Sequence, residues 1–91
     1  MSNKESASEA EKLVGEVVHY YSKIGVAVVE LSDSLKKGDS VRIVGGVDTD
    51  FTQKIKSIEV DHEKIEVAKK GDSVGLKVDQ KVREGYKVYK I

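Results

Sequence analysis

The sequence predicts an all-β protein, a small sandwich or closed barrel of six or seven strands, of which we favour the closed β-barrel. From Leu13 onward, short runs are rich in β-branched residues, which favour strands. Turn residues separate these runs about every 8–12 residues, a spacing typical of sandwiches and barrels. Closure is favoured because a closed barrel leaves no strand edge open to other chains.

The chain divides into a flexible N-terminal arm, residues 1–12, and one β-barrel domain, residues 13–91. The arm consists mainly of Ser, Ala, Glu and Lys, which bury too little surface to offset the entropy of ordering. A helical turn over Glu9–Lys12 is marginal without tertiary support. A domain of 91 residues needs nearly all its apolar side chains inside, so we expect little apolar surface for an interface.

The first two strands are expected to form a hairpin. Leu13–Tyr21 and Ile24–Leu31 are rich in Val, and the short polar segment Ser22–Lys23 separates them. Leu35–Asp39 then has the composition of a turn. It leads into a strand over Ser40–Val44, in which alternation places every second residue, Val41 and Ile43, on the core face.

The next strand is expected to bend. Phe51–Val60 is the longest expected strand, but its apolar parity changes along the run. Phe51 and Ile55 share one face, whereas Ile58 falls on the other. A bulge or sharp bend near Lys56–Ser57 would return the later residues to the core.

Three shorter apolar segments complete the domain. Ile65–Val67 is followed by Ala68–Asp72, which repeats the turn composition of Leu35–Asp39. Ser73–Val78 alternates cleanly between apolar and small or charged residues. Gly85 then precedes the last expected strand, Tyr86–Ile91.

In this order, the turns and strands resemble domain II of elongation factor Tu and other translational GTPases. The matching segments span most of residues 14–88; they are Gly15–Val17, Gly25–Leu31, Leu35–Asp39, Lys56–Val60 and Ala68–Leu76. Further segments are similar to small standalone translation-elongation-factor-like proteins; they are Thr49–Gln53, Ser57–Glu63 and Val82–Tyr89. A related barrel also closes some U32 peptidase chains.

The resemblance implies a Greek-key barrel that, in full-length factors, contacts the aminoacyl end of tRNA or ribosomal RNA beside a GTPase domain. The sequence contains no Gly-x-x-x-x-Gly-Lys-Ser/Thr loop. Because that loop cradles the phosphates in such GTPases, we expect no GTP binding.

The possible general bases and metal ligands have structural explanations. His19 is expected to be a partly exposed strand histidine, because no nucleophile motif surrounds it. Asp61–Glu63, which includes His62, fits a solvated turn, since adjacent strand residues point to opposite faces. Asp48–Asp50 could seat a hard cation, but carboxylates in a Gly-rich loop are commonly turn formers.

No catalytic apparatus is visible in the sequence. The chain has no Cys, which excludes disulfides, thiolate metal sites and cysteine nucleophiles. Glu16, Glu30, Glu59 and Glu84 could supply paired carboxylates, but nothing brings two of them to a substrate cleft. We therefore expect no enzyme activity, no metal and no cofactor.

The composition predicts a cytoplasmic protein. Sixteen Lys and Arg balance sixteen Asp and Glu, so no global field draws the protein to nucleic acid or membranes. No apolar run is long enough for a signal peptide or a membrane span. Any nucleic-acid binding must therefore come from a local patch.

Arg42, Lys54 and Lys56 share the parity opposite the core and could form such a patch with the turn lysines. The candidate RNA-binding residues are Lys36, Lys37, Arg42, Lys54, Lys56, Lys69 and Lys70. Tyr20, Tyr21, Tyr86 and Tyr89 could stack on bases or simply fill volume in a chain without Trp. Interleaved carboxylates also fit a surface that serves solubility alone.

The sequence thus favours a non-enzymatic binding module that contacts tRNA, ribosomal RNA or a translation-related ribonucleoprotein. Two alternatives remain open. One is an adaptor that docks a protein partner, and the other is a detached accessory barrel of an enzyme such as a U32-type peptidase.

Overall fold

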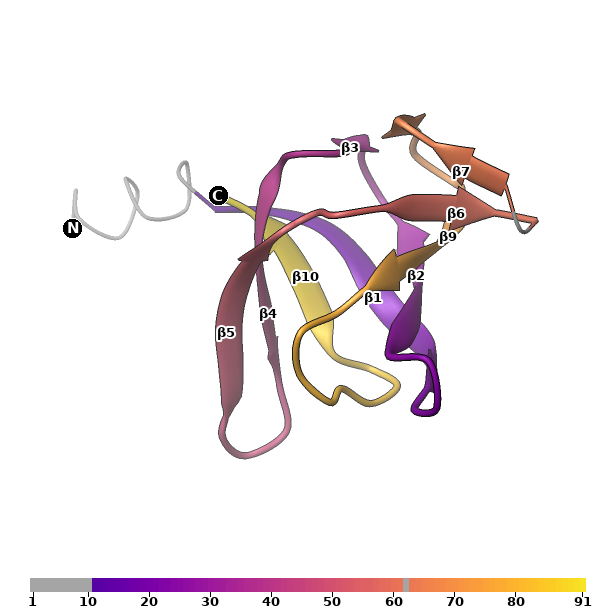
Figure 1. Cartoon of the computed structure of the whole chain (residues 1–91). Helices are drawn as coiled ribbons and strands as arrows, with labels where there is room; N and C mark the ends of the chain where they lie inside the picture. The colour runs from indigo at the N-terminus through magenta and orange to yellow at the C-terminus, as the bar shows by residue number, and fades with distance from the viewer. Residues whose placement is uncertain (1–10, 62) are drawn as a thin grey trace, which may run out of the picture.

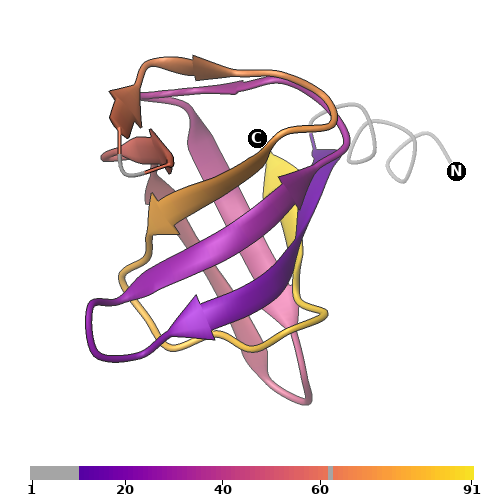
Figure 2. The same cartoon turned by 90° about the vertical axis from the view of Figure 1, so that its right-hand side faces the viewer.

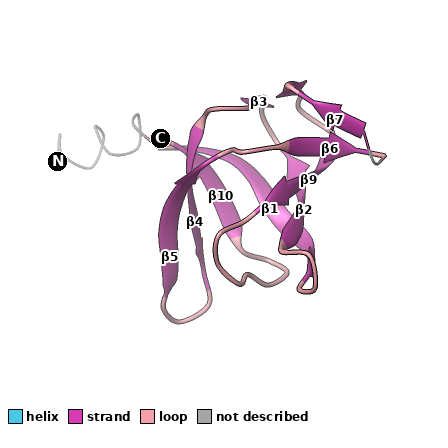
Figure 3. Ribbon diagram, viewed as in Figure 1, coloured by secondary structure: helices cyan, strands magenta, loops and turns pink. Residues whose placement is uncertain are grey.

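A computed structural model describes residues 11–61 and 63–91. All but the last two residues of the expected arm, 1–12, therefore lie outside the described residues. Every regular element in the described part is a strand (Figure 3), and no helix there could span a membrane. The strands are β1 (Lys12–Tyr21), β2 (Val26–Leu31), β3 (Leu35–Lys36), β4 (Ser40–Gly45), β5 (Thr49–Lys54), β6 (Ile58–Val60), β7 (Glu63–Ile65), β8 (Val67–Ala68), β9 (Ser73–Lys77) and β10 (Lys87–Lys90).

The strands build an all-β barrel, as the sequence predicts. Eight of them form one antiparallel sheet in the order β5-β4-β10-β1-β2-β9-β6-β7, and β3 pairs with β8. The sheet curls so that β1, β2 and β9 form one wall and β4, β5 and β10 face them (Figures 1 and 2). The described part contains more strands than the six or seven expected, because the bends leave strands of only two or three residues at β3, β6, β7 and β8.

The expected first hairpin is confirmed. β1 pairs with β2, and the turn between them covers residues 22–25. The pairing register shifts between Val17 and His19, which marks a bulge at Val18. A bulge adds one residue to its strand and changes which face the following side chains occupy.

The bend expected near Lys56–Ser57 is present, but it divides the segment into two strands. β5 ends at Lys54, β6 begins at Ile58, and β6 pairs with β9 and β7 rather than with β4. The expectation that Phe51–Val60 forms the longest strand is therefore wrong, and β1 is longer. At the start of the bend, the Ile55 amide donates a hydrogen bond to the Asp39 carbonyl at 2.8 Å.

The two Lys-Lys-Gly-Asp turns have the same geometry. The Asp39 carboxylate accepts from the Lys36 amide at 3.0 Å, and the Asp72 carboxylate accepts from the Lys69 amide at 2.9 Å. The glycine of each turn, Gly38 or Gly71, has a positive φ. Because β3 and β8 pair with each other, these turns lie at opposite ends of one two-stranded ribbon.

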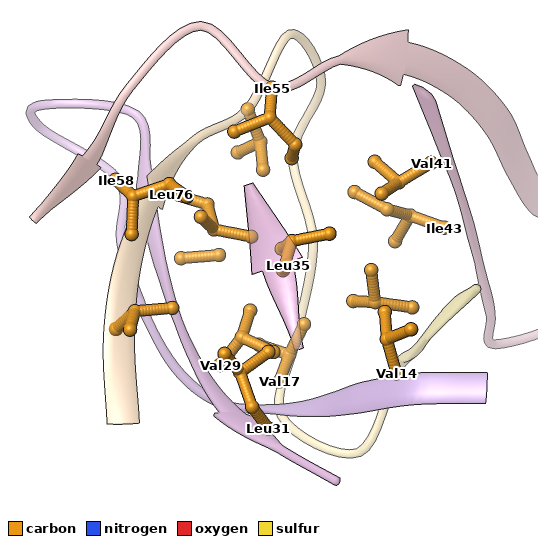
Figure 4. Packing of buried hydrophobic residues seen from close by; sticks show 14 of the residues in the cluster. Val14, Val17, Val29, Leu31, Leu35, Val41, Ile43, Ile55, Ile58 and Leu76 are labelled. Carbon is orange, nitrogen blue, oxygen red and sulfur yellow. The ribbon is translucent and has the colours of Figure 1, made fainter. Parts of the chain in front are cut away.

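The core is a single cluster of aliphatic side chains with one Phe. Figure 4 shows side chains from the surrounding strands pointing toward Leu35 at the centre. The sequence pattern is confirmed at Val41, Ile43, Ile55 and Ile58, all of which are buried. Burying each such side chain contributes on the order of 1.5–3 kcal/mol, so the packing of these Val, Leu and Ile side chains is a main source of stability.

Gln53 is the one polar side chain among residues 11–61 and 63–91 that is buried beside this core, with 8% of its surface exposed. Its amide nitrogen donates to the Lys77 carbonyl at 2.8 Å, and its oxygen accepts from the Asp79 amide at 2.7 Å. Gln53 lies on β5, and Lys77 ends β9. The side chain therefore joins two parts of the barrel wall that the sheet order places far apart.

Candidate functional site

Arg42, the centre of the expected basic patch, is neutralised. Its guanidinium donates to both oxygens of Glu11, at 2.8 and 3.0 Å, and to both oxygens of Asp50, at 2.8 and 2.6 Å. The hydrogen bonds that Arg42 donates to Asp50, and then those that it donates to Glu11, raise the pKa of Arg42. The same pairing lowers the pKa of Asp50. With these donors occupied, Arg42 can contact a phosphate only by giving up a carboxylate.

The other two residues of the expected stripe differ from each other. Lys54 lies on β5 opposite Ser40 and is exposed. Lys56 lies in the bend and forms an ion pair with Asp79. The structure therefore breaks the stripe, because carboxylates distant in sequence pair with two of its three cations.

The four turn lysines gather around the β3–β8 ribbon at one end of the barrel. Lys36, Lys37, Lys69 and Lys70 are all exposed. Within residues 11–61 and 63–91, none of them has a carboxylate at ion-pair distance. Together with Lys54, these four lysines are the members of the expected basic patch that have no carboxylate partner in the described part of the chain.

The ligand clusters that the sequence analysis considered and set aside, Asp61–Glu63 and Asp48–Asp50, do not gather three possible metal ligands among the described residues. Asp61 occupies a turn with φ of 53°, Glu63 is exposed, and His62 lies outside the described residues. Asp50 is held by Arg42. A cation at Asp48–Asp50, which the sequence left as the less favoured possibility, would therefore compete with Arg42 for the Asp50 carboxylate.

Two of the four glutamates do come together, which the sequence did not indicate. Glu16 and Glu30 are cross-strand partners on β1 and β2. The Lys87 ammonium lies 3.1 Å from the Glu16 carboxylate, so part of their mutual repulsion is offset. The hollow beside them holds only about 150 Å³, which is small for a substrate site.

A larger hollow lies at the opposite end of the barrel from the turn lysines. It has a volume of about 490 Å³ and is formed by the end of β1 and the loop between β9 and β10. Figure 1 shows this loop and the β1–β2 turn together at the lower end, away from β3. The lining residues are His19, Tyr20, Ser22, Lys81, Val82, Arg83 and Glu84.

His19 organises the rim of this hollow. It lies on β1 and is half exposed, as expected, and its Nδ1 is 3.6 Å from the Glu84 carboxylate. Its ring meets the Tyr21 ring edge to face, with centroids 4.4 Å apart. Val82, with 1% exposure, anchors the loop to the core. The rim is therefore held by aromatic, polar and apolar contacts.

Lys81 and Arg83 belong to this site, although the sequence interpretation did not single them out. They flank the buried Val82 in a segment without regular structure. The alternation of an apolar residue between two cations is the only local signal for them. Their proximity to β1 depends on the fold, because Lys81 follows Tyr21, the last residue of β1, by sixty positions.

Comparison with known proteins identifies relatives over nearly the whole chain. An uncharacterized protease of Methanocaldococcus jannaschii is 41% identical over 92% of this chain, and a collagenase of Porphyromonas gingivalis is 33% identical over 92%. The chain spans only about a fifth of these relatives, 21% and 20% of their lengths.

A solved structure matches the barrel alone. The C-terminal domain of a candidate U32 peptidase of Geobacillus thermoleovorans superposes with a TM-score of 0.82 at 26% identity, covering 88% of this chain and 92% of that domain. Its selenomethionine variant gives 0.80 at 25% identity, covering 85% and 96%. Residues 34–88 also match the family described as elongation factor Tu domain 2. The chain therefore belongs to the elongation factor Tu domain 2 family.

Proposed function

We propose that this chain is a non-catalytic accessory barrel of a U32-type peptidase. One observation supports this above the others: the chain corresponds almost end to end to a peptidase C-terminal domain, while it spans a fifth of the proteases it matches. The alternative weighed from the sequence, a detached enzyme barrel, thus gains more support than RNA contact.

The surface chemistry fits an accessory role. The described residues gather no set of three possible metal ligands, and the paired Glu16 and Glu30 border a hollow of about 150 Å³. Bond cleavage would therefore belong to a separate peptidase part. The barrel would position that part or its polypeptide substrate.

A chimera tests the proposal. This chain replaces the matching 85 residues of the M. jannaschii protease, and a second variant lacks that segment altogether. We expect the chimera to hydrolyse fluorescent casein at nearly the natural rate and deletion to slow hydrolysis at least about tenfold, equivalent to about 1.4 kcal/mol. Equal rates for the natural protease and the deletion variant would overturn the proposal.

RNA contact is the second candidate, supported by the exposed turn lysines and the family match. The site would be the β3–β8 end of the barrel rather than the stripe through Arg42. Amide NMR titration with tRNA, at low and high salt, tests it. Shifts near Lys36 and Lys69 that disappear with salt would support electrostatic RNA binding. No shifts at low salt would remove this candidate.

A further inference from the structure

The outer face of the barrel is apolar around the β1–β2 turn. On this part of the hairpin, two cross-strand pairs share the outer face: His19 with Val28, and Tyr21 with Val26. The pair between them, Tyr20 with Ala27, faces inward, and Ala27 is fully buried. Val18, at the bulge that precedes these pairs, is also exposed, so the outer face extends from Val18 to the turn.

Large apolar side chains on this face are exposed to solvent. Val18 is 43% exposed, Tyr21 is 50% exposed and Ile24 is 57% exposed. Farther along the same two strands, the outer face carries the glutamate pair instead. We call the apolar region the β1–β2 corner; its residues are Val18, His19, Tyr21, Ile24, Val26 and Val28. The expectation that little apolar surface remains for an interface is not met here.

The β1–β2 corner is recessed on one side and hollowed on another. Gly75, on β9, lies opposite Val28 and adds no side chain to the outer face. A Cβ at Gly75 would lie 3.2 Å from the Val26 Cγ1 atom. A second hollow, of about 290 Å³, is lined by Tyr20 through Ile24 at the turn itself. Such a surface can receive protruding side chains of a partner.

Cations border the corner. Lys23 lies in the turn, and Lys81 and Arg83 line the adjoining hollow. Among the described residues, none of these three has a carboxylate at ion-pair distance. The carboxylate of Glu84 faces His19. The rim thus presents an excess of positive charge around an apolar centre.

We propose that the β1–β2 corner is the surface on which the barrel docks against the peptidase part of its enzyme. The complementary face would carry protruding apolar side chains bordered by Asp and Glu. This inference rests on the proposed function and identifies the partner surface within it. The relatives indicate what would bind there: about four-fifths of their length lies outside the matched segment, and we take this remainder to be the docking partner.

A second copy of the chain fits the corner less well. A symmetric pair would place the same surface against itself, bringing each cationic rim against its equivalent. Like charges facing each other across an interface cost several kcal/mol. Charge complementarity therefore favours a different protein face with acidic residues.

Lysine footprinting in the chimera tests this docking surface. Acylation rates are measured at Lys23 and Lys81, with Lys36 and Lys70 at the opposite end as internal controls, in the isolated chain and in the chimera. We expect labelling of Lys23 and Lys81 to slow about fivefold or more in the chimera while the controls stay unchanged, as for surfaces removed from solvent by a partner.

Matched substitutions separate docking from general surface effects. Ile24 and Val67 are equally exposed, at 57%, but only Ile24 lies in the corner. We expect Ile24→Ser, alone or with Tyr21→Ser, to restore labelling of Lys23 and Lys81 in the chimera, whereas Val67→Ser does not. Urea unfolding of each isolated variant checks that the barrel remains folded.

The outcomes distinguish the two proposals. Protection of Lys36 and Lys70 in place of Lys23 and Lys81 would show that the β1–β2 corner is not the docking surface, while the proposed accessory role would still stand. No protection anywhere, in a chimera no more active than the deletion variant, would overturn both. Self-association of the isolated chain in sedimentation, abolished by Ile24→Ser, would assign the corner to a second copy and overturn this inference.

Discussion

The side-chain amide of Gln53, on β5, donates to the carbonyl oxygen of Lys77 at the end of β9, at 2.8 Å. The same side chain accepts a hydrogen bond from the Asp79 amide, at 2.7 Å. One residue thereby satisfies two backbone groups in the segment that leaves β9. β5 and β9 are not paired strands, so the Gln53 side chain provides hydrogen bonds there that a backbone ladder would otherwise provide.

Replacing Gln53 by Ala should destabilise the barrel by about 2–4 kcal/mol, because the Lys77 carbonyl and the Asp79 amide lose a part-buried hydrogen-bond partner. Urea unfolding measures the change in midpoint at constant slope. Thr52→Ala, an exposed neighbour on β5, serves as control and should be nearly neutral. A loss below about 0.5 kcal/mol, the usual range for surface changes, would mean that water replaces the amide.

The sequence predicted the walls of the barrel better than the joint between them. Alternation correctly assigned Val41 and Ile43 to the core, because the period of a strand is local information. Gln53 shares the inward parity of Phe51 and Ile55, but its partners lie more than twenty residues away, at the end of β9 and in the irregular segment that follows it. Identifying its role requires the tertiary arrangement.

Gly45 should resist substitution because the Tyr86 ring lies against its backbone. A Cβ at Gly45 would lie 2.2 Å from Tyr86 Cδ1, so Gly45→Ala forces the ring to move at a cost of about 1–3 kcal/mol. In a Tyr86→Ala background the same substitution should cost much less. A double-mutant cycle from urea unfolding measures this coupling.

Gly75→Ala is the control for that cycle. Gly75 is also a strand glycine, but its added Cβ would lie no closer than 3.2 Å to the Val26 Cγ1 atom and 3.8 Å to the Glu59 carbonyl oxygen. We expect a small effect that does not depend on Tyr86. If Gly45→Ala cost the same with and without the Tyr86 ring, the cost would come from the backbone conformation of Gly45 rather than from contact with the ring.

The repeated turns predict equal costs at Gly38 and Gly71. Their φ values are 95° and 92°, and a Cβ at either would meet nothing within 4 Å. Alanine should therefore cost about 1–2 kcal/mol at each position through backbone strain alone. Asparagine, which tolerates this region better, should cost less. Thermal unfolding of the four variants tests this, and a clear inequality between the two turns would contradict it.

The candidate site was harder to predict than the fold. Parity correctly placed Arg42 on the outer face with Lys54, yet could not reveal that Glu11 and Asp50 occupy its guanidinium. The apolar corner was missed because the bulge at Val18 shifts the face of the residues that follow. Bulges and ion pairs depend on which strands become neighbours, and composition does not encode that.

The Arg42–Asp50 pair predicts how stability responds to acid. Arg42 holds the pKa of Asp50 below its ordinary value in the folded chain. A depressed folded-state pKa contributes stability above the unfolded value, about 3.9 for Asp, and that contribution is lost as pH falls through the folded-state pKa. Asp50→Asn should therefore lower the free energy of unfolding near neutral pH, and the difference from wild type should shrink below about pH 4.

Urea unfolding of both proteins between pH 7 and pH 2 measures that difference. The hydrogen bond from Lys12 also lowers the pKa of Asp33, but this contribution is common to both proteins and cancels. Asp48→Asn removes a charge from the same hairpin without removing a contact to Arg42, so its effect should show little of this acid dependence. Because the pair is partly open to solvent, 1 M salt should reduce the Asp50→Asn effect at neutral pH. A difference that persists unchanged to pH 2 would assign the effect of Asp50 to packing rather than to its charge.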